Sequence, residues 1–249
     1  FERRVDALER QSVEGADAIV CTSERDADVY REKYDPGGPI LVAPNGTYED
    51  ALREHQPDSA AAKRVRQRYG IPEDATVCLF MGSDYKPNAE AANAVVDIAR
   101  EFVDKPEDVH FLVMGSVGNS LDESALPENV TVTGYVEDDF EAHFDAADIA
   151  LNPMQSGGGT NIKLVDYFAR SLPVVSTPFG VRGTQVTDDE HVLVAELNEY
   201  ADAIARLAHH PGERTELGHA ARRLAAAEYT WEASSRKLRE FITREFGPS

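Results

Sequence analysis

The residues best suited to chemistry lie in one short stretch between an apolar run and a helical segment. A buried strand is predicted at 149–151, and the three glycines Gly157, Gly158 and Gly159 follow it closely. Glycine has no Cβ, so a ligand can approach the backbone N–H groups of such a loop. A helix expected at 162–170 adds the free N–H groups and the partial positive charge of a helix N-terminus. This combination predicts an anion site, most simply for phosphate.

Two charged side chains near the start of that helix refine the prediction. Lys163 offers a cation to a phosphate, and only six of the 25 basic residues of the chain are lysines. Asp166 adds a carboxylate, which can accept hydrogen bonds from both hydroxyls of a ribose. Thr160 or Asn161 is expected to cap the helix. A nucleoside diphosphate satisfies the glycines, the cation and the acid together. The alternative is that the three glycines form only a flexible turn and that Lys163 and Asp166 are solvated charges on the helix.

The elements that must position these residues alternate between strand and helix. Strands are predicted at 17–22, 40–43, 76–81, 109–114, 130–133, 149–151, 174–176 and 192–195. Helices are predicted at 60–69, 89–102, 138–146, 162–170, 200–208, 212–227 and 231–244, and a further helix opens at Ser23, its expected N-cap. Residues 47–57 are polar and are expected to form a connection. The alternation predicts an α/β fold with a doubly wound parallel sheet.

The composition excludes several classes of protein. The 249 residues carry 45 acidic and 25 basic side chains, which gives a net charge of −20, and 42% of the residues are hydrophobic. Nucleic acids and anionic membranes need a basic surface, so neither is an expected partner of this chain. An acidic shell with few lysines is typical of a high-salt cytoplasm, where ions screen the self-repulsion. The chain is therefore expected to be halophilic, and an ordinary acidic enzyme is the alternative.

The cysteines and the apolar runs indicate the compartment in which the protein is expected to reside. Cys21 and Cys78 each lie in a short apolar run, so both are predicted to be buried thiols in strands and not a disulfide. No Cys and His spacing typical of a metal site occurs, and no apolar run approaches the length of a membrane span. A cytoplasmic location without a metal is the expectation.

The glycine-rich stretch also carries a family resemblance. The order of apolar strand, Pro, glycine-rich turn, Lys-x-x-Asp and the Pro-Val-Val-Ser-Thr strand at 173–177 resembles the donor site of retaining GT-B glycosyltransferases. The most similar branch is family 4, whose members use nucleotide sugars and often carry Glu-x7-Glu here. Asp166 matches the second acid, whereas Gly158 stands where the first would fall. Ser171 and Ser83 stand where the family often has Gly and Arg.

The same resemblance implies further contacts with the donor. Gly82, after the strand at 76–81, matches a family glycine. Lys86 would take the role of the lysine that neutralises the leaving diphosphate, and the alternative is a loop that simply starts a helix. Backbone at Val136, after the Gly134 turn, would hold the nucleobase. Tyr135 would cover the base or pack on the surface.

The resemblance covers nearly the whole chain and implies its domains. Residues 1–46 would be the end of a first, acceptor-side Rossmann-like domain, and 47–230 the Rossmann-like domain that binds the nucleotide-sugar donor. Residues 231–249 would form a helix that crosses back to the first domain.

The implied function is retaining transfer of a sugar from a nucleotide-diphosphate sugar to an acceptor hydroxyl of a glycan, a lipid or another molecule. Lys163 and Lys86 would stabilise the departing phosphate without a metal or a further cofactor. Peripheral membrane association would occur only through the rest of the first domain. The alternatives are a non-catalytic nucleotide-sugar-binding module and another GT-B enzyme, such as a sugar-nucleotide epimerase or a phosphorylase.

Overall fold

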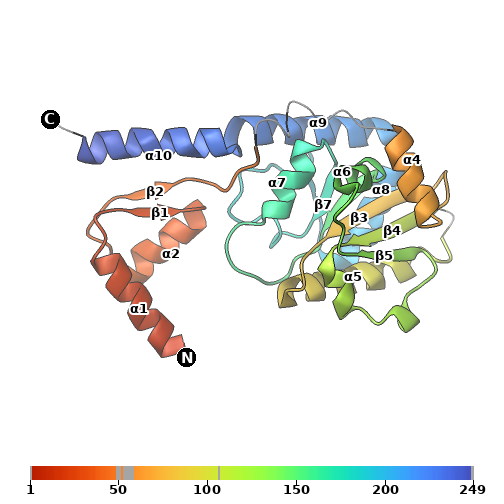
Figure 1. Cartoon of the computed structure of the whole chain (residues 1–249), viewed down its shortest axis with the longest axis horizontal. Helices are drawn as coiled ribbons and strands as arrows, with labels where there is room; N and C mark the ends of the chain where they lie inside the picture. Colours follow the sequence, from red (N-terminus) through yellow and green to blue (C-terminus); the bar gives the residue numbers. More distant parts are fainter. Residues whose placement is uncertain (1, 49–51, 53–58, 106, 248–249) are drawn as a thin grey trace.

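The protein consists of a large α/β unit and a smaller unit beside it (Figure 1). The computed structural model describes residues 2–48, 52, 59–105 and 107–247. Most of the predicted connection at 47–57 lies outside these residues, namely 49–51 and 53–57.

The large unit is built on a six-stranded parallel sheet. Its strands are β3 (Thr76–Met81), β4 (Val109–Met114), β5 (Val130–Gly134), β6 (Ile149–Asn152), β7 (Val174–Ser176) and β8 (Leu193–Val194). Their order is β5-β4-β3-β6-β7-β8. The chain winds outward from β3 to β5 and then returns to β6, so the direction of winding reverses between β3 and β6. In open parallel sheets this switch point, at the carboxyl ends of the strands, is where ligands bind.

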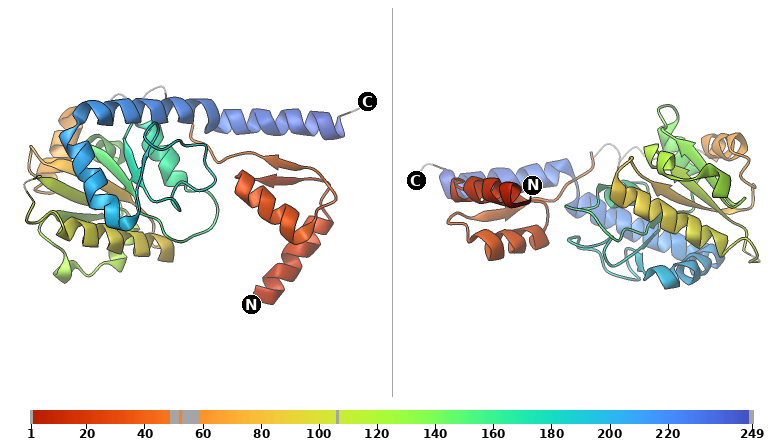
Figure 2. Two further views of the ribbon diagram at one scale, coloured as in Figure 1. Left: turned by 180° about the vertical axis from the view of Figure 1, so that it is seen from behind. Right: turned by 90° about the horizontal axis from the view of Figure 1, so that it is seen from below.

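Helices cover both faces of the sheet (Figures 1 and 2). They are α4 (Ser59–Arg68), α5 (Lys86–Arg100), α6 (Phe140–Asp145), α7 (Ile162–Ala169), α8 (Tyr200–His209) and α9 (Pro211–Glu228). Short 3-10 helices are η1 (Ser116–Ser120), η2 (Glu123–Ala125) and η3 (Leu197–Glu199).

Strand alternation accounts for the two hydrophobic cores. Cys78 and Phe80 point from β3 into the core that α5 and α8 cover. Val77 and Leu79 point to the opposite face, into the core that α7 and α9 cover. Successive side chains of a strand face opposite sides, and a strand buried on both sides is therefore apolar throughout. The structure confirms the predicted doubly wound parallel fold.

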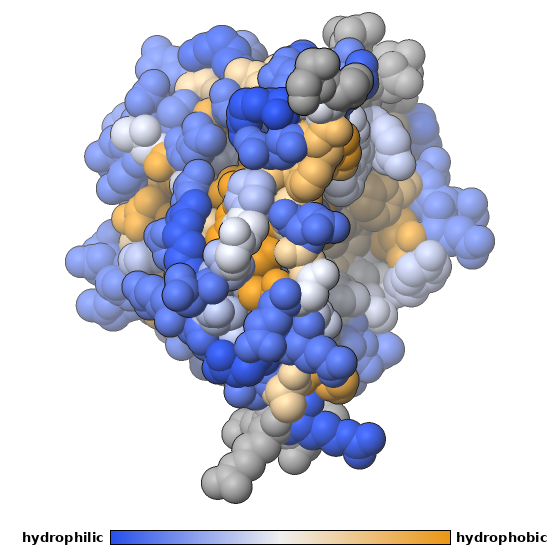
Figure 3. Space-filling model, turned by 90° about the vertical axis from the view of Figure 1, so that its left-hand side faces the viewer, coloured by the Kyte–Doolittle hydropathy of each residue, from blue (hydrophilic) through white to orange (hydrophobic). Residues whose placement is uncertain are grey.

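The smaller unit contains a two-stranded parallel sheet. Its elements are α1 (Glu2–Glu14), β1 (Ile19–Cys21), α2 (Glu24–Tyr34) and β2 (Ile40–Val42). Ser23 caps α2, as predicted, because its Oγ accepts a hydrogen bond from the N–H of Asp26 at 3.1 Å. Figure 3 faces the side on which this unit lies and shows apolar atoms near the middle of a largely hydrophilic surface.

The C-terminal helix α10 (Trp231–Phe246) continues the direction of α9 and runs beside the small unit (Figures 1 and 2). Two backbone hydrogen bonds fix the crossing: Thr47 N–H to the Tyr229 carbonyl at 2.8 Å and Trp231 N–H to the Thr47 carbonyl at 3.0 Å. Ser234 Oγ also donates to the Pro44 carbonyl at 2.5 Å. The division at residues 46 and 230 stays a prediction.

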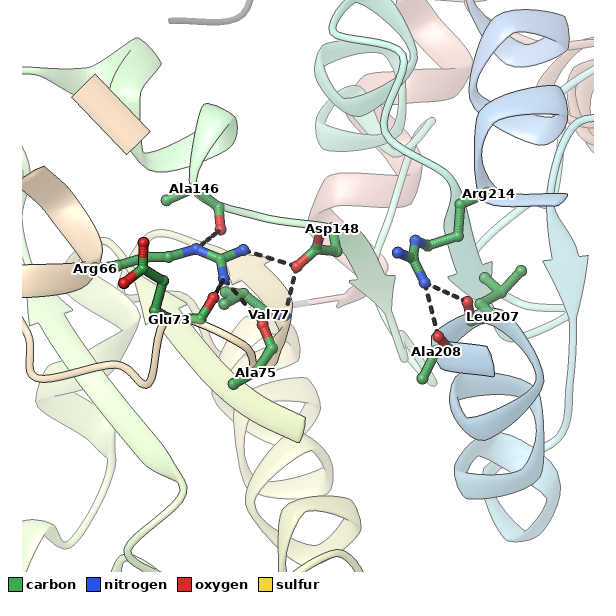
Figure 4. A network of polar contacts seen from close by, with 9 residues as sticks. All are labelled: Arg66, Glu73, Ala75, Val77, Ala146, Asp148, Leu207, Ala208 and Arg214. Atoms are coloured by element: carbon green, nitrogen blue, oxygen red, sulfur yellow. Dashed lines mark hydrogen bonds and ion pairs between the residues drawn. The ribbon is translucent and has the colours of Figure 1, made fainter. Parts of the chain in front are cut away.

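An ion pair and its hydrogen bonds lie at the amino-terminal ends of the strands of the large sheet, called here its amino-terminal edge (Figure 4). The Arg66 side chain on α4 donates to Asp148 Oδ2 at 2.8 Å, and its Nε donates to the Ala146 carbonyl at 3.1 Å. Asp148 Oδ2 also accepts the N–H of Val77 at 2.8 Å. This network joins α4 to the starts of β3 and β6.

Most predicted elements agree with the structure, but two helices begin two or three residues away from the predicted start. The bounds of β3, β4 and β7 are those predicted. Helix α6 begins at Phe140 and not at 138, because Asp139 has a left-handed backbone with φ of 57°. The acidic run at 137–139 therefore precedes the helix, and only Glu141 places an acid in its first turn. Helix α5 begins at Lys86, three residues earlier than predicted, since Pro87 fits the first turn of a helix.

Both cysteines, Cys21 and Cys78, are buried free thiols, as predicted. In the part of the chain that the structure describes, no helix is long and apolar enough to cross a membrane.

Candidate functional site

A buried asparagine at the end of β6 positions the start of α7. The Asn152 side chain is fully buried, and its Nδ2 donates to Ser176 Oγ on β7 at 2.9 Å. Its Oδ1 accepts a hydrogen bond from Asn161 Nδ2 at 2.6 Å. Asn161 is the N-cap residue of α7, but its side chain makes no capping hydrogen bond to the helix. The prediction that Thr160 or Asn161 is the N-cap is therefore confirmed for Asn161, although its side chain is held by the end of β6 and does not cap the helix.

The glycine-rich loop has a backbone that favours glycine. Gly157 has a φ of 124° and Gly159 a φ of 63°, both in a region that other residues rarely adopt. A Cβ built at Gly158 would meet nothing within 4 Å, so open space adjoins the loop there. The loop lies directly after β6, at the switch point of the sheet.

Lys163 points from the first turn of α7 toward the end of β3 and the first turn of α5. Its Nζ donates to Asn88 Oδ1 at 2.7 Å and lies 4.6 Å from the centroid of the Phe80 ring. Burial lowers the pKa of this amine to about 7. Within the described residues no carboxylate pairs with it. Lys163 is thus a desolvated amine, and an anionic ligand bound beside it would be its charge partner.

Gly82 and Asn88 hold the exit of β3 close to α5. A Cβ at Gly82 would lie 3.1 Å from the Asn88 Cβ and 3.3 Å from the Val117 Cβ, so a side chain there would require these neighbours to shift. Asn88 Nδ2 donates to the Ser83 carbonyl at 3.1 Å, while its Oδ1 receives Lys163. Asn88 was not identified as a site residue from the sequence. The feature of the sequence that could have identified Asn88 is a polar residue in the first turn of an otherwise apolar helix face.

The predicted site residue Lys86 is the first residue of α5. Its side chain is 86% exposed, and its Nζ lies 3.8 Å from Glu90 Oε1. The Glu90 carboxylate also accepts a hydrogen bond from Ser156 Oγ, just before the glycines. Lys86 therefore reaches the glycine-rich loop only through Glu90, and its role in binding stays a prediction.

Asp166 lies on α7 beside Arg170. Its Oδ1 is 3.7 Å from Arg170 Nη1, and 35% of its side chain is exposed. Burial raises the pKa of this carboxyl, and the nearby Arg170 guanidinium opposes that shift. Val136, after β5, packs against the core on the α7 side of the sheet. No hydrogen bond in the described part of the chain joins Asp166 to Val136 or to Lys163, so their common role in nucleotide binding stays a prediction.

The small unit also reaches the site. Asn45 Nδ2, after β2, donates to Thr160 Oγ1 at 3.0 Å. A Cβ at Gly183 would lie 2.8 Å from the Ser23 Cβ, so the loop after β7 touches the start of α2. The sequence predicts Thr160 as a site residue, but it gives no sign of the contact with Asn45, 115 residues away.

The family model for Glycosyl transferases group 1 matches residues 75–210 of this chain. The chain belongs to this family. The match contains β3 to β8, and with them Lys163, the glycine-rich loop and Asp166. The predicted resemblance to GT-B glycosyltransferases is confirmed.

Two curated proteins that are similar to this chain are named as glycosyltransferases. One is the GDP-mannose-dependent alpha-(1-6)-phosphatidylinositol monomannoside mannosyltransferase of Mycobacterium tuberculosis, 26% identical over 94% of this chain and 63% of the relative. Another is D-inositol 3-phosphate glycosyltransferase 2 of Catenulispora acidiphila, 28% identical over 95% of this chain and 58% of the relative. The chain thus spans about three fifths of the length of these relatives.

Solved structures agree on the fold of this glycosyl transferase family member. Sucrose-phosphate synthase from Thermosynechococcus elongatus superposes with a TM-score of 0.80 at 21% identity, covering 100% of this chain and 63% of that one. Anabaena HepE in complex with UDP and glucose superposes with a TM-score of 0.80 at 13% identity, covering 98% of this chain and 67% of that one. At these identities the likeness concerns the fold alone.

Proposed function

We propose that this chain is the donor-binding part of a retaining glycosyltransferase that moves a sugar from a nucleotide-diphosphate sugar to an acceptor hydroxyl. The observation that carries the proposal is the convergence of three anion-binding features at the switch point between β3 and β6. These are the backbone of the loop at 157–159, the N-terminus of α7 and the amine of Lys163. Membership of the glycosyl transferase group 1 family supports the reaction class.

The chemistry assigned to these groups follows from charge. As the glycosidic bond to the nucleotide breaks, negative charge grows on the departing phosphate. Lys163 and the loop N–H groups are held in place before reaction and would stabilise that charge. Lys86 would join them, because its ammonium is exposed and its i,i+4 ion pair with Glu90 is worth only about 0.3–0.5 kcal/mol. These groups would replace a metal ion, so the reaction would need no cofactor besides the nucleotide-sugar donor and the acceptor.

The remaining predicted contacts would orient the nucleoside. The backbone at Val136, at the carboxyl end of β5, would hold the base, and the carboxylate of Asp166 would accept the ribose hydroxyls. The M. tuberculosis relative is named for a GDP-mannose donor, whereas HepE was solved with UDP. Both nucleotides therefore belong in the test.

The partners of the whole protein follow from the same proposal. The acceptor would be a glycan, a lipid or another hydroxyl compound, as the lipid named for the M. tuberculosis relative illustrates. Peripheral membrane association would come through parts of the protein outside this chain. The acidic composition and the two buried free thiols support a high-salt cytoplasm as its setting.

Two departures from the family pattern favour a second candidate, a non-catalytic nucleotide-sugar-binding module. Gly158 stands where family members often carry an acid, and open space surrounds it. Ser83 likewise stands where an Arg is usual. A module would bind the donor but would not transfer its sugar.

Calorimetry with UDP, GDP and ADP in molar KCl tests the binding half of the proposal. Binding of at least one nucleotide is expected, and Lys163→Met should weaken it by about 1.5–3 kcal/mol, the value of a charged hydrogen bond. Failure of all three nucleotides to bind would overturn the proposal. Product analysis of the bound nucleotide sugar, with and without acceptor, then separates transfer from epimerisation and from binding alone.

A further inference from the structure

Arg182 lies behind the glycine-rich loop, on the segment that follows β7. Its guanidinium carbon stacks 3.8 Å from the centroid of the Phe179 ring, and its Nη1 donates to the Phe179 carbonyl at 2.9 Å. Its Nη2 donates to two carbonyls of the loop, Gly157 at 3.0 Å and Gly159 at 2.9 Å. One planar side chain, fixed by stacking, thus binds both glycines that have positive φ.

These two hydrogen bonds determine where the N–H groups of the loop point. In a trans peptide the C=O and the N–H of the same plane point in opposite directions. Because the carbonyls of Gly157 and Gly159 point toward Arg182, the N–H groups of Gly158 and Thr160 point away from it. A loop of three glycines would otherwise sample many backbone conformations, since glycine is the least restricted residue.

We propose that Arg182 is a positioning residue of the diphosphate site: it fixes two peptide planes of the glycine-rich loop so that the N–H groups of Gly158 and Thr160 face the phosphates. The inference rests on the proposed function, since it concerns the same donor site. Arg182 itself does not touch the ligand.

The charge of Arg182 acts in the same direction as its geometry. A guanidinium stays protonated in proteins, so its hydrogen bonds to the two carbonyls are charge-assisted. Such bonds polarise the peptide groups and make their N–H ends better donors to an anion. The neighbouring Asp26 on α2 offsets part of the positive charge, and Arg25 adds to it. The effect on the phosphates is therefore carried mainly through the loop.

The experiment compares Arg182→Met with Arg182→Lys and the parent chain. Met keeps a stem that packs on Phe179 but donates no hydrogen bond, whereas Lys keeps the charge without the planar fork. The chain should bind UDP or GDP about tenfold more weakly as Arg182→Met, and by an intermediate amount as Arg182→Lys. The loss should be smaller for UMP or GMP, because fewer phosphate oxygens reach the loop. Hydrogen exchange of the amides at 157–160 in the ligand-free chain should speed up in Arg182→Met.

Arg206→Met is the matched control. Arg206 also carries a guanidinium with several partners, Asp189 and Glu213, but it lies on α8. This control should leave nucleotide binding and exchange at 157–160 unchanged. If the parent binds a nucleoside diphosphate and Arg182→Met binds it equally well, or loses diphosphate and monophosphate affinity in equal proportion, the positioning role is overturned while the proposed function stands. If the parent binds none of these nucleotides, both are overturned.

Discussion

At the scale of single residues, Lys163 decides how the site responds to pH. Burial against Phe80 and α5 lowers its pKa to about 7, so at about pH 8 the free protein holds it mostly neutral. A bound diphosphate would favour the charged amine and raise that pKa. Binding at this pH should therefore take up as much as one proton, and affinity should fall as the pH rises further.

Calorimetry in two buffers of different ionisation enthalpy measures that proton uptake. At about pH 8 the phosphate groups of the free nucleotide are already deprotonated, since the last phosphate pKa is about 6, so the proton must go to the protein. The binding heat should differ between buffers for the parent and much less for Lys163→Met. Equal heats in the two buffers for the parent would contradict the role of Lys163 as the cation that meets the phosphates.

Asp166 offers a second residue-scale prediction, about the ribose. Asp166→Ala should weaken UDP or GDP binding by about 1.5–3 kcal/mol, and Asp166→Asn by less because one neutral acceptor remains. A 2′-deoxy nucleotide should lose affinity for the parent and much less for Asp166→Ala, as expected of coupled groups in a double-mutant cycle. Arg170 keeps its ion pair with Glu141 in these variants, so the fold should be retained. The same deoxy penalty in both proteins would rule out contact between Asp166 and the ribose.

At the scale of elements, local patterns predicted the sheet well. The largely apolar runs at 76–81 and 109–114 form strands of those bounds, because a strand buried on both faces is apolar at nearly every position. The start of α6 was mispredicted because the left-handed backbone at Asp139 depends on its surroundings and not on residue type alone. Lys163 and the glycine-rich loop were placed at the correct strand end because both lie within one continuous motif.

The contacts that support this motif could not be predicted in the same way. Asn152 holds Asn161 across nine positions, but Ser176 is 24 positions away and Asn88 lies 75 from Lys163. Arg182 is 23 positions from Gly159. Such pairs form only after the sheet has brought distant strand ends together. The spacing of these residues along the chain therefore does not predict the contacts.

The network at the amino-terminal edge gives an element-scale prediction about stability. Asp148→Ala would leave Arg66 and the N–H of Val77 without their shared acceptor (Figure 4). We expect a loss of about 2–4 kcal/mol in the free energy of unfolding, measured by urea denaturation. Nucleotide affinity should not change, because this edge is opposite to the carboxyl ends of the strands.

Asp97→Ala is the control for that measurement. Asp97 also pairs with an arginine, Arg100, but its side chain is 74% exposed. Exposed pairs contribute about 0–1 kcal/mol, so this variant should stay close to the parent. Equal effects of the two substitutions would mean that the Asp148 network does not hold α4 to the sheet.

At the scale of the whole molecule, the net charge of −20 governs the response to salt. Like charges repel over a screening distance of about 10 Å in 0.1 M salt, which falls to about 3 Å in 1 M. Screening relieves this repulsion more in the compact folded state than in the expanded unfolded chain. The thermal midpoint should therefore rise by several degrees as KCl increases from about 0.1 to about 2 M.

The pH of the experiment separates charge screening from a general effect of the salt on hydration. Near the sequence pI of about 4.7 the acidic excess is largely neutralised, so the rise in midpoint with KCl should shrink there. Sucrose stabilises folded proteins by exclusion from their surface and screens no charge. The rise in the thermal midpoint caused by sucrose should therefore be similar at the acidic and the neutral pH. The rise caused by KCl should be larger at the neutral pH. A midpoint that does not depend on KCl at neutral pH would contradict the halophilic interpretation. The parallel fold and the nucleotide site would be unaffected by that result, since neither depends on the surface charge.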